Sequence, residues 1–307
     1  MVIRKLFGLI FLAFLLLSIA SCASASSFSL PIDFSPGMPA LPDGRISDRE
    51  YQDDSIHVLL DQGVYEGTEY WTAHITIADA SQLRTAAVDS FDSTRGRVAK
   101  GRVMARRVNA ILAINGDYFS FYADGYLFRQ GQMYRNLPSK RKVDVLLIDA
   151  AGDFHIVPSA TEETLAPFAN MDIVNTFNFG PALVIDGQPV TEFAFRRGDL
   201  SAMEERRQRM CFAQAGPLEY LCIATAGADR GSIGMTIREF AAFVYETFDV
   251  KHAYNLDGGD STMMFFHAEK INDVQNASLR QLSDIIYFAS AVADSNLNSC
   301  AGSKSAQ

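Results

Sequence analysis

The 307-residue sequence lacks several patterns that would point directly to a chemistry. It contains no G-x-S-x-G elbow, no P-loop, no HExxH pair and no dinucleotide-binding GxGxxG. Its five histidines are scattered without metal-ligand spacing, and its four cysteines form no C-x-x-C pair. These absences argue against a serine-hydrolase elbow, a nucleotide-binding loop, a histidine-based triad and a structural zinc site.

The charge balance excludes a further class of protein. The formal net charge is −9 and the pI is about 5.1, so the chain has no basic excess of the kind that binds nucleic acid. An anionic substrate would have to be met by a local group of basic residues. With 48% hydrophobic and 21% charged residues, the composition is that of a globular protein able to bury a large core.

Two cysteines lie inside the region that we expect to fold. Cys211 and Cys222 both occur in apolar, strand-like stretches. We expect them to be small buried hydrophobic residues. A disulfide between them is the alternative outside the cell, and spacing alone does not decide it.

The first residues have the layout of an export signal. Arg4 and Lys5 precede an apolar run over residues 6–20, and small residues follow. The run I-A-S-C, ending at Cys22, resembles a bacterial lipobox, in which this cysteine is lipidated and becomes the mature N-terminus. The sequence therefore predicts a signal peptide over residues 1–22 and an exported protein, at the cell surface or elsewhere outside the cytoplasm, that is lipid-anchored at Cys22. Ordinary cleavage in the following A-S-A, or an uncleaved membrane anchor, are the alternatives.

The rest of the chain divides into three parts. Residues 23–50 are rich in Ser, Pro, Asp and Gly and are expected to form a tether or irregular lead-in. Residues 51–293 contain many strand-like stretches and few helical ones, without regular alternation. This favours an α+β fold: a single domain with a mixed or antiparallel sheet core and a few packed helices. Residues 294–307 are expected to be a loose polar tail.

Local signals place several elements. M-T-I-R-E-F-A-A-F-V-Y-E-T-F predicts a helix, because Thr236 can cap it and Glu239 lies at capping-box spacing. Apolar residues at helical spacing over 98–108 predict another helix, although glycines weaken it. V-D-V-L-L-I-D-A-A-G-D-F-H-I-V and F-N-F-G-P-A-L-V-I-D-G-Q-P-V each predict a β-hairpin around an Asp- and Gly-containing turn.

Polar residues follow two of the apolar strands. A-I-L-A-I-N ends in Asn115, Gly116 and Asp117, and H-A-Y-N-L runs into N-L-D-G-G-D-S-T-M-M over residues 255–264. Side chains just beyond a strand end are well placed to contact a ligand. Asn, Asp and Gly also form ordinary turns, so two simple turns are the alternative. Because both groups follow apolar strands, we favour a binding or catalytic site.

Six segments in order carry a resemblance to a known family. They are A-I-N-G-D-Y-F, F-G-P-A-L-V-I-D-G-Q, Arg209 before a strand, S-I-G-M-T-I-R-E-F-A, N-L-D-G-G-D-S-T-M-M-F-F and L-S-D-I-I-Y-F. Together, over residues 102–289, they resemble the phosphodiester glycosidase family, whose bacterial members are often labelled exopolysaccharide biosynthesis proteins. The resemblance implies a hydrolase that cleaves the C–O bond between a sugar and a phosphodiester in glycans or cell-envelope polymers.

Roles for individual residues follow from this resemblance. Asp257 supplies a carboxylate at the anomeric carbon, as nucleophile or as the base for water. Arg209 clamps the phosphate with its planar fork, and Gly258 and Gly259 bring main-chain N–H groups close to it. The leaving phosphate needs little protonation, so a site without a histidine acid can suffice. Asp260 stands where the family usually has a third glycine and is assigned to turn formation.

The remaining candidates surround these groups. Ser261 and Thr262 donate hydrogen bonds, Gly116 allows the chain to turn, and Asn115 and Asp117 bind sugar hydroxyls, with Asp117 as an alternative second carboxylate. Asn255 and Arg280 are supporting residues. Hard oxygen ligands near Asp117, Asp257 and Asp260 make a divalent metal conceivable, but no loop has a recognised spacing, so no metal and no cofactor is expected.

Two other functions stay open at this stage. The same cleft would serve a non-catalytic protein that binds glycan phosphates during envelope or exopolysaccharide assembly. A phosphodiesterase that cuts P–O instead of C–O is the third possibility. In each case the expected partners are a glycan or sugar phosphodiester and, through the lipid or signal anchor, a membrane; no nucleic acid is expected.

Overall fold

The computed structural model describes residues 28–92, 97–139, 143–193, 203–228, 231–272 and 280–293. The expected signal segment with Cys22 and the expected tail over residues 294–307 lie outside these ranges. Within them, no helix has the length and the apolar character needed to cross a bilayer.

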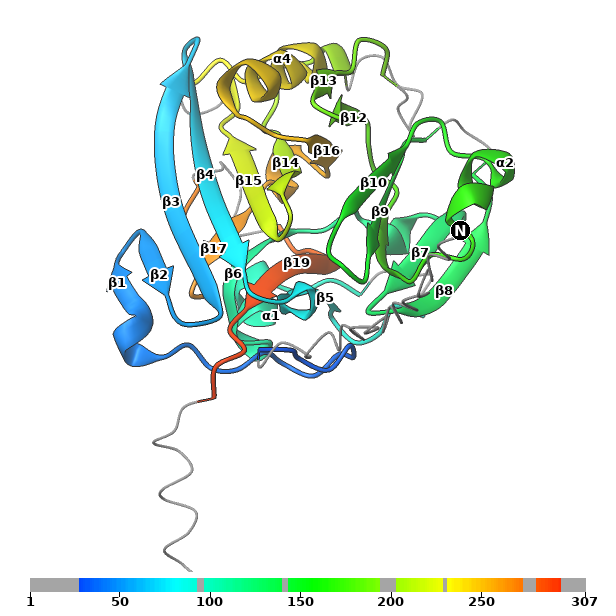
Figure 1. Cartoon of the computed structure of the whole chain (residues 1–307). Helices are drawn as coiled ribbons and strands as arrows, with labels where there is room; N and C mark the ends of the chain where they lie inside the picture. Colours follow the sequence, from blue (N-terminus) through cyan, green and yellow to red (C-terminus); the bar gives the residue numbers. More distant parts are fainter. Residues whose placement is uncertain are drawn as a thin grey trace, which may run out of the picture.

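Two large antiparallel sheets form the framework (Figure 1). The first has nine strands in the order β1 (Arg45–Ser47), β2 (Glu50–Gln52), β3 (Ile56–Tyr65), β4 (Thr68–Ile77), β15 (Glu219–Thr225), β14 (Met210–Gly216), β16 (His252–Leu256), β12 (Ala182–Ile185) and β13 (Gln188–Pro189). The second has five, in the order β18 (Glu269–Lys270), β17 (Met264–Phe266), β6 (Ala110–Asn115), β19 (Asp284–Ala289) and β5 (Leu83–Ala87).

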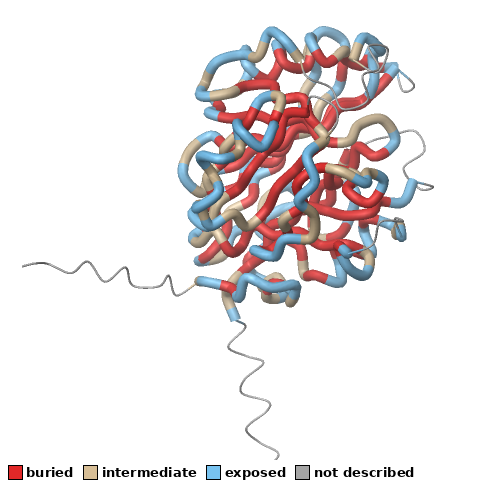
Figure 2. Tube along the Cα trace, turned by 90° about the vertical axis from the view of Figure 1, so that its right-hand side faces the viewer, coloured by how far each residue is buried: buried red, intermediate tan, exposed pale blue. Residues whose placement is uncertain are grey.

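The two sheets pack face to face around the main core. Val58, Phe212 and Tyr254 of the larger sheet and Ile114 and Phe288 of the smaller one belong to one buried apolar cluster. Figure 2 shows the buried strands at the centre of the molecule and exposed residues mainly in the loops. Every strand pairing in the described chain is antiparallel, which confirms the expected α+β domain with an antiparallel sheet core.

Helices cover the outer faces of these sheets. α4 (Ile237–Thr247) packs on the larger sheet through Phe240 and Val244. The predicted capping box is confirmed, since the Thr236 side chain accepts from the Glu239 amide and the Glu239 side chain accepts from the Thr236 amide. Two helices are short: α1 (Gly101–Arg107), which covers the smaller sheet, and α2 (Glu162–Leu165). The described 3-10 turns are η1 (Pro42–Gly44), η2 (Ala80–Gln82), η3 (Phe119–Phe121), η4 (Ala166–Phe168) and η6 (Gly259–Ser261).

The helix predicted over residues 98–108 is shorter than expected and begins at Gly101. A Cβ atom at this position would lie 2.6 Å from the ring of Phe265 in the sheet beneath. The glycine that weakens the helical pattern is therefore the residue that lets the helix start close to the sheet.

The predicted hairpins are confirmed. β9 (Val145–Asp149) pairs with β10 (Phe154–Val157), and β12 pairs with β13 around a turn in which Asp186 and Gly187 both have positive φ. Cys211 and Cys222 are buried free thiols and form no disulfide with each other. Cys211 packs under α4 whereas Cys222 points into the inter-sheet core, because successive strand side chains face opposite sides of a sheet.

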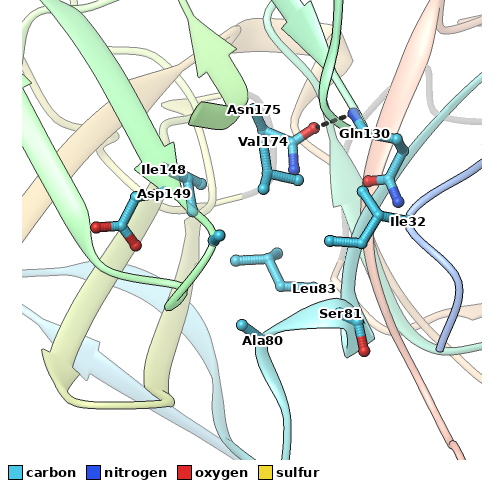
Figure 3. A pocket seen from close by; sticks show the side chains of 10 residues that line it. Ile32, Ala80, Ser81, Leu83, Gln130, Ile148, Asp149, Val174 and Asn175 are labelled. Atoms are coloured by element: carbon cyan, nitrogen blue, oxygen red, sulfur yellow. Dashed lines mark hydrogen bonds between the residues drawn. The ribbon is translucent and has the colours of Figure 1, made fainter. Parts of the chain in front are cut away.

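Two small sheets close the side of the core. β9 lies between β10 and β11 (Ile173–Phe177), and β7 (Gly125–Arg129) pairs with β8 (Gln132–Leu137). Figure 3 shows a small cavity where β9 and β11 meet the edge of the five-stranded sheet. Ile32 and Leu83 line it, and at its rim the main-chain N–H of Gln130 donates to the side-chain oxygen of Asn175.

The N-terminal part of the described chain is packed against the domain. We call residues 30–38 the strap. Its main-chain carbonyls at Pro31, Asp33 and Ser35 accept hydrogen bonds from the buried guanidinium of Arg84. The part of the predicted lead-in that the structure describes, residues 28–50, thus contributes the strap, the edge strand β1 and the first residue of β2.

Candidate active site

The two polar strand ends predicted from the sequence meet in the structure. Asn115, the last residue of β6, donates through its side-chain amide to the carbonyl oxygen of Asp257 at 2.8 Å. Its side-chain oxygen accepts from the Met263 amide at 3.2 Å. One buried asparagine thus ties the 115–117 bend to both ends of the loop between β16 and β17.

The paired glycines, Gly258 and Gly259, let this loop pack closely against the segment that leads into β14. A Cβ atom at Gly258 would lie 2.8 Å from the Gln208 carbonyl oxygen. Gly259 has φ +60° and donates its amide to the same carbonyl at 3.0 Å. The glycines therefore serve close backbone packing and a left-handed turn, two requirements that other residues meet poorly.

The main chain of Arg209 lies next to the same loop, because Arg209 directly follows Gln208. Its side chain is 5% exposed and donates to the main-chain carbonyls of Met235 at 2.9 Å and Glu205 at 2.8 Å. Burial, reinforced by the charge of Arg207, lowers the pKa of Arg209 to about 10. The predicted clamp therefore lies against main-chain oxygens beneath the surface.

The other predicted residues divide between the surface and the interior. Asn255 is buried in β16 and donates to the Gly180 carbonyl at 2.7 Å. Ser261 and Thr262 are buried in the loop after it. Arg280 is exposed and donates through Nε to the Ser261 hydroxyl at 3.1 Å. This arginine is the basic group that the structure brings to the edge of the loop.

A small pocket of about 10 Å³, room for about one water molecule, lies between these segments and is partly open to solvent. Its described lining includes Asn115, Gly116, Asp257 and Ser261, which all belong to the predicted set. Arg209 and Asn255 are not among the lining residues, nor is Asp117. The structure therefore gathers part of the predicted site around one pocket. Four buried polar members, Asp117, Arg209, Asn255 and Thr262, lie outside its described lining.

Asp117 lies in a buried cluster of charges beneath this pocket. Its Oδ1 accepts from Nη2 of Arg129 at 2.8 Å, and its Oδ2 accepts from the Asn178 amide at 2.9 Å. The same Arg129 nitrogen is 3.5 Å from Oδ2 of Asp284. Arg129 also packs against aromatic rings, the nearest being Phe177 at 4.5 Å. Two carboxyl groups thus share one buried guanidinium.

Asp284 is the member of this cluster that also lines the pocket. Burial, and next the charge of Asp117, raise its pKa to about 7 against the opposing effect of Arg129. Sequence reasoning did not select this residue. The available signal was an acidic residue opening the strongly apolar run D-I-I-Y-F-A of β19.

The family of the chain is decided by residues 108–289, which match the model of the phosphodiester glycosidase family. This is more than half of the 307 residues, and it contains every residue of the site described above. The chain belongs to the phosphodiester glycosidase family.

Solved structures with the same fold include an enzyme domain. The catalytic domain of zebrafish N-acetylglucosamine-1-phosphodiester alpha-N-acetylglucosaminidase, auto-inhibited by its pro-peptide, matches with TM-score 0.58 and 14% identity over 82% of this chain and 86% of that one. A hypothetical protein from Synechocystis matches with TM-score 0.53 and 14% identity over 79% of this chain and 64% of that one. At such identity these likenesses establish the fold alone. No curated protein matches the chain in sequence.

An aromatic group beside the pocket was also missed by sequence reasoning. Tyr118 lines the pocket, has φ +64° and stacks on Phe121 with ring centroids 3.7 Å apart. The Arg280 guanidinium lies 6.0 Å from the centre of the Tyr118 ring. A left-handed tyrosine is conformationally costly, and such residues concentrate at functional sites.

Among the described residues, no group of three or more His, Cys, Asp and Glu side chains is arranged to hold a metal ion. The carboxylates of the site are instead divided between the buried Asp117–Arg129–Asp284 cluster and the less buried Asp257.

Proposed function

We propose that this chain is an exported hydrolase that cleaves a sugar-1-phosphodiester at the glycosidic C–O bond, in glycans or cell-envelope polymers. The observation that carries the proposal is the pocket in which Asp257 meets the 115–116 bend and Ser261. The family match supplies the reaction class.

The chemistry requires a carboxylate at the anomeric carbon and positive charge at the phosphate. Cleavage passes through an oxocarbenium-like transition state, which a carboxylate stabilises or captures. Asp257 is the partly exposed carboxylate of the pocket and takes this role. The C–O bond breaks with its electron pair on the phosphate oxygen, and the anionic monoester leaves.

The phosphate is met by Arg280 and by the loop beside it. Arg280 is exposed, and it is held in place by the Ser261 hydroxyl and by the Tyr118 ring. A guanidinium so fixed offers donors in a planar fork that fits two phosphate oxygens. Arg209 acts one layer back in this proposal, because its hydrogen bonds hold the segment that carries Gln208 and hence the glycine turn.

The test of this function compares two aspartates of one loop. Asp257→Asn should lower kcat on a chromogenic or natural sugar-1-phosphodiester by about 10²- to 10⁴-fold, the range of a lost acid–base or nucleophilic group. Asp260→Asn is the matched control, because Asp260 is exposed and three residues away. It should retain activity within a few-fold.

Two outcomes would change the proposal. Turnover that survives Asp257→Asn removes this carboxylate from the chemistry. Glycan-phosphate binding without turnover, in both the parent and the variant, identifies instead a non-catalytic protein of envelope or exopolysaccharide assembly.

We also propose that the protein is attached to a membrane by lipid at Cys22, on the strength of the lipobox-like I-A-S-C sequence. Cys22→Ala should move the protein from the membrane fraction to the soluble exported fraction and abolish labelling by a fatty-acid analogue. Unchanged labelling would rule out this anchor. Unchanged fractionation without labelling would favour an uncleaved signal anchor.

A further inference from the structure

Asp284 is a buried carboxyl group that none of the predicted roles uses. It begins β19, is 1% exposed, and its carboxylate lies directly behind Gly116. A Cβ atom at position 116 would come within 2.1 Å of its Oδ2. The missing side chain at Gly116 is what allows this carboxyl group to reach the pocket wall, where it and Asp257 are both lining residues.

The two carboxyl groups beside Arg129 are not equivalent. Both oxygens of Asp117 accept hydrogen bonds, one from Arg129 and one from the Asn178 amide. In Asp284, Oδ1 accepts from the Ser283 hydroxyl at 2.8 Å, whereas Oδ2 has the longer ion pair with Nη2 of Arg129 at 3.5 Å and no hydrogen bond within the described residues. An unsatisfied oxygen in a buried carboxyl group is costly, and a water or substrate proton in the pocket would satisfy it.

Charged and titratable groups reach Asp284 from several elements. The bend after β6 provides Asp117, β7 provides Arg129, and the loops around the pocket provide Asp257, Tyr118 and, at the edge, Arg280. On its other side β5 places uncharged Ala87 opposite it in the ladder. Burial raises the pKa of Asp284 most; among the neighbouring charges, Asp117 raises it further and Arg129 lowers it.

We infer that Asp284 is the proton acceptor of the hydrolytic step, with Asp117 and Arg129 as the positioning pair that adjusts it. This rests on the proposed function. A water O–H bond breaks, the water oxygen bonds to the anomeric carbon, and the proton passes to Oδ2 of Asp284. The C–O bond to the phosphate breaks, and its electron pair leaves on the phosphate oxygen. The proton on Asp284 is then released to solvent.

In this division of roles, Asp257 faces the anomeric carbon and Asp284 accepts the proton. The division also gives the reaction a pH dependence, since an acceptor must be ionised. With the pKa of Asp284 near 7, activity should fall as the pH drops through neutrality. An exposed aspartate as the acceptor would keep the enzyme active down to about pH 4.

The first experiment measures kcat, KM and their pH dependence for Asp284→Asn. We expect kcat to fall about 10²- to 10⁴-fold with KM changed little, and the acidic limb of the profile to disappear from the residual activity. Thermal unfolding of the variant checks that it is folded.

Two further variants keep Asp284 and should shift the acidic limb of the pH–activity profile in opposite directions. Asp117→Asn removes the negative neighbour, so the limb should move to lower pH. Ser283→Ala removes a hydrogen bond to the ionised form, so the limb should move to higher pH. A residue with only a structural role would alter the amplitude of the profile and not shift its midpoint in this paired way.

A readout independent of turnover completes the test. Infrared difference spectra between about pH 5 and about pH 9 should show a protonated buried carboxyl group that ionises near neutrality in the parent and is missing in Asp284→Asn. Turnover in the parent that Asp284→Asn leaves intact, or limbs that do not move, overturns the assignment of Asp284 alone. A parent that titrates as expected but hydrolyses no glycosyl phosphodiester overturns the proposed function and this role together.

Discussion

Two arginines in the described part of the chain, Arg84 and Arg129, are fully buried at 0% exposure, and the groups around them differ. Arg84 donates to Tyr287 and to four main-chain carbonyls, three of them in the strap. Arg129 pairs with two carboxyl groups, packs on aromatic rings, and leaves its Nε without a partner among the described residues. Both cations lie in the same β5–β19–β6 region of the fold.

The difference fits a structural use of buried charge at Arg84 and the proposed positioning role of Arg129 beside Asp284. The Arg84 guanidinium donates mainly to main-chain carbonyl groups. Its one ion pair within the described residues is with Asp33, which lies 3.4 Å away and is exposed. Arg129 also donates to the Phe128 and Thr176 carbonyls, but its cation serves two carboxyl groups as well, and one oxygen of Asp284 has no hydrogen bond within the described residues. Incomplete compensation of this kind is costly in a core and is expected where a site uses the titration.

The largest effect on stability is expected for Arg129→Met. Removing the shared cation leaves two buried carboxyl groups facing each other, which should cost about 3–5 kcal/mol of unfolding free energy. Protonation relieves the repulsion, so the loss should shrink as the pH falls from about 8 to about 5. Urea unfolding at several pH values measures this. A loss that is independent of pH would contradict the account of this cluster.

A smaller effect is expected for Arg84→Met, the matched control. Its carbonyl partners in the strap can turn toward water, so the cost should be about 1–3 kcal/mol. This loss should be nearly constant across the same pH range. The carbonyl partners do not titrate, and Asp33, whose pKa is lowered by its hydrogen bonds with Ser35 and by Arg84, stays ionised. Hydrogen exchange should increase mainly in the strap over residues 30–38. A strong pH dependence here would erase the distinction between the two arginines.

Much of the fold follows from local sequence signals. The capping box at Thr236 and Glu239, the turn at Asp186–Gly187 and the short apolar runs each require only neighbouring residues, and each is present in the structure. The meeting of the 115–117 bend with the 255–264 loop was also foreseeable, because two apolar strands end in polar residues. These predictions depend on backbone geometry, which sequence periodicity reports directly.

The charge cluster could not be predicted in the same way. Arg129 and Asp284 lie on strands of different sheets far apart in the sequence, and nothing local marks them as partners. Arg209 shows the converse. The family resemblance suggested a phosphate clamp, yet the side chain is engaged by the Met235 and Glu205 carbonyls. Whether a polar residue at a strand end faces the pocket or the interior depends on tertiary packing.

The most direct test of the central claim is hydrolysis of a sugar-1-phosphodiester in isotopically labelled water. Attack at the anomeric carbon, with Asp257 facing it and Asp284 accepting the proton, predicts that the labelled oxygen appears in the released sugar. Labelled oxygen in the released phosphate would show P–O cleavage and would contradict the assignment of this site as a phosphodiester glycosidase centre.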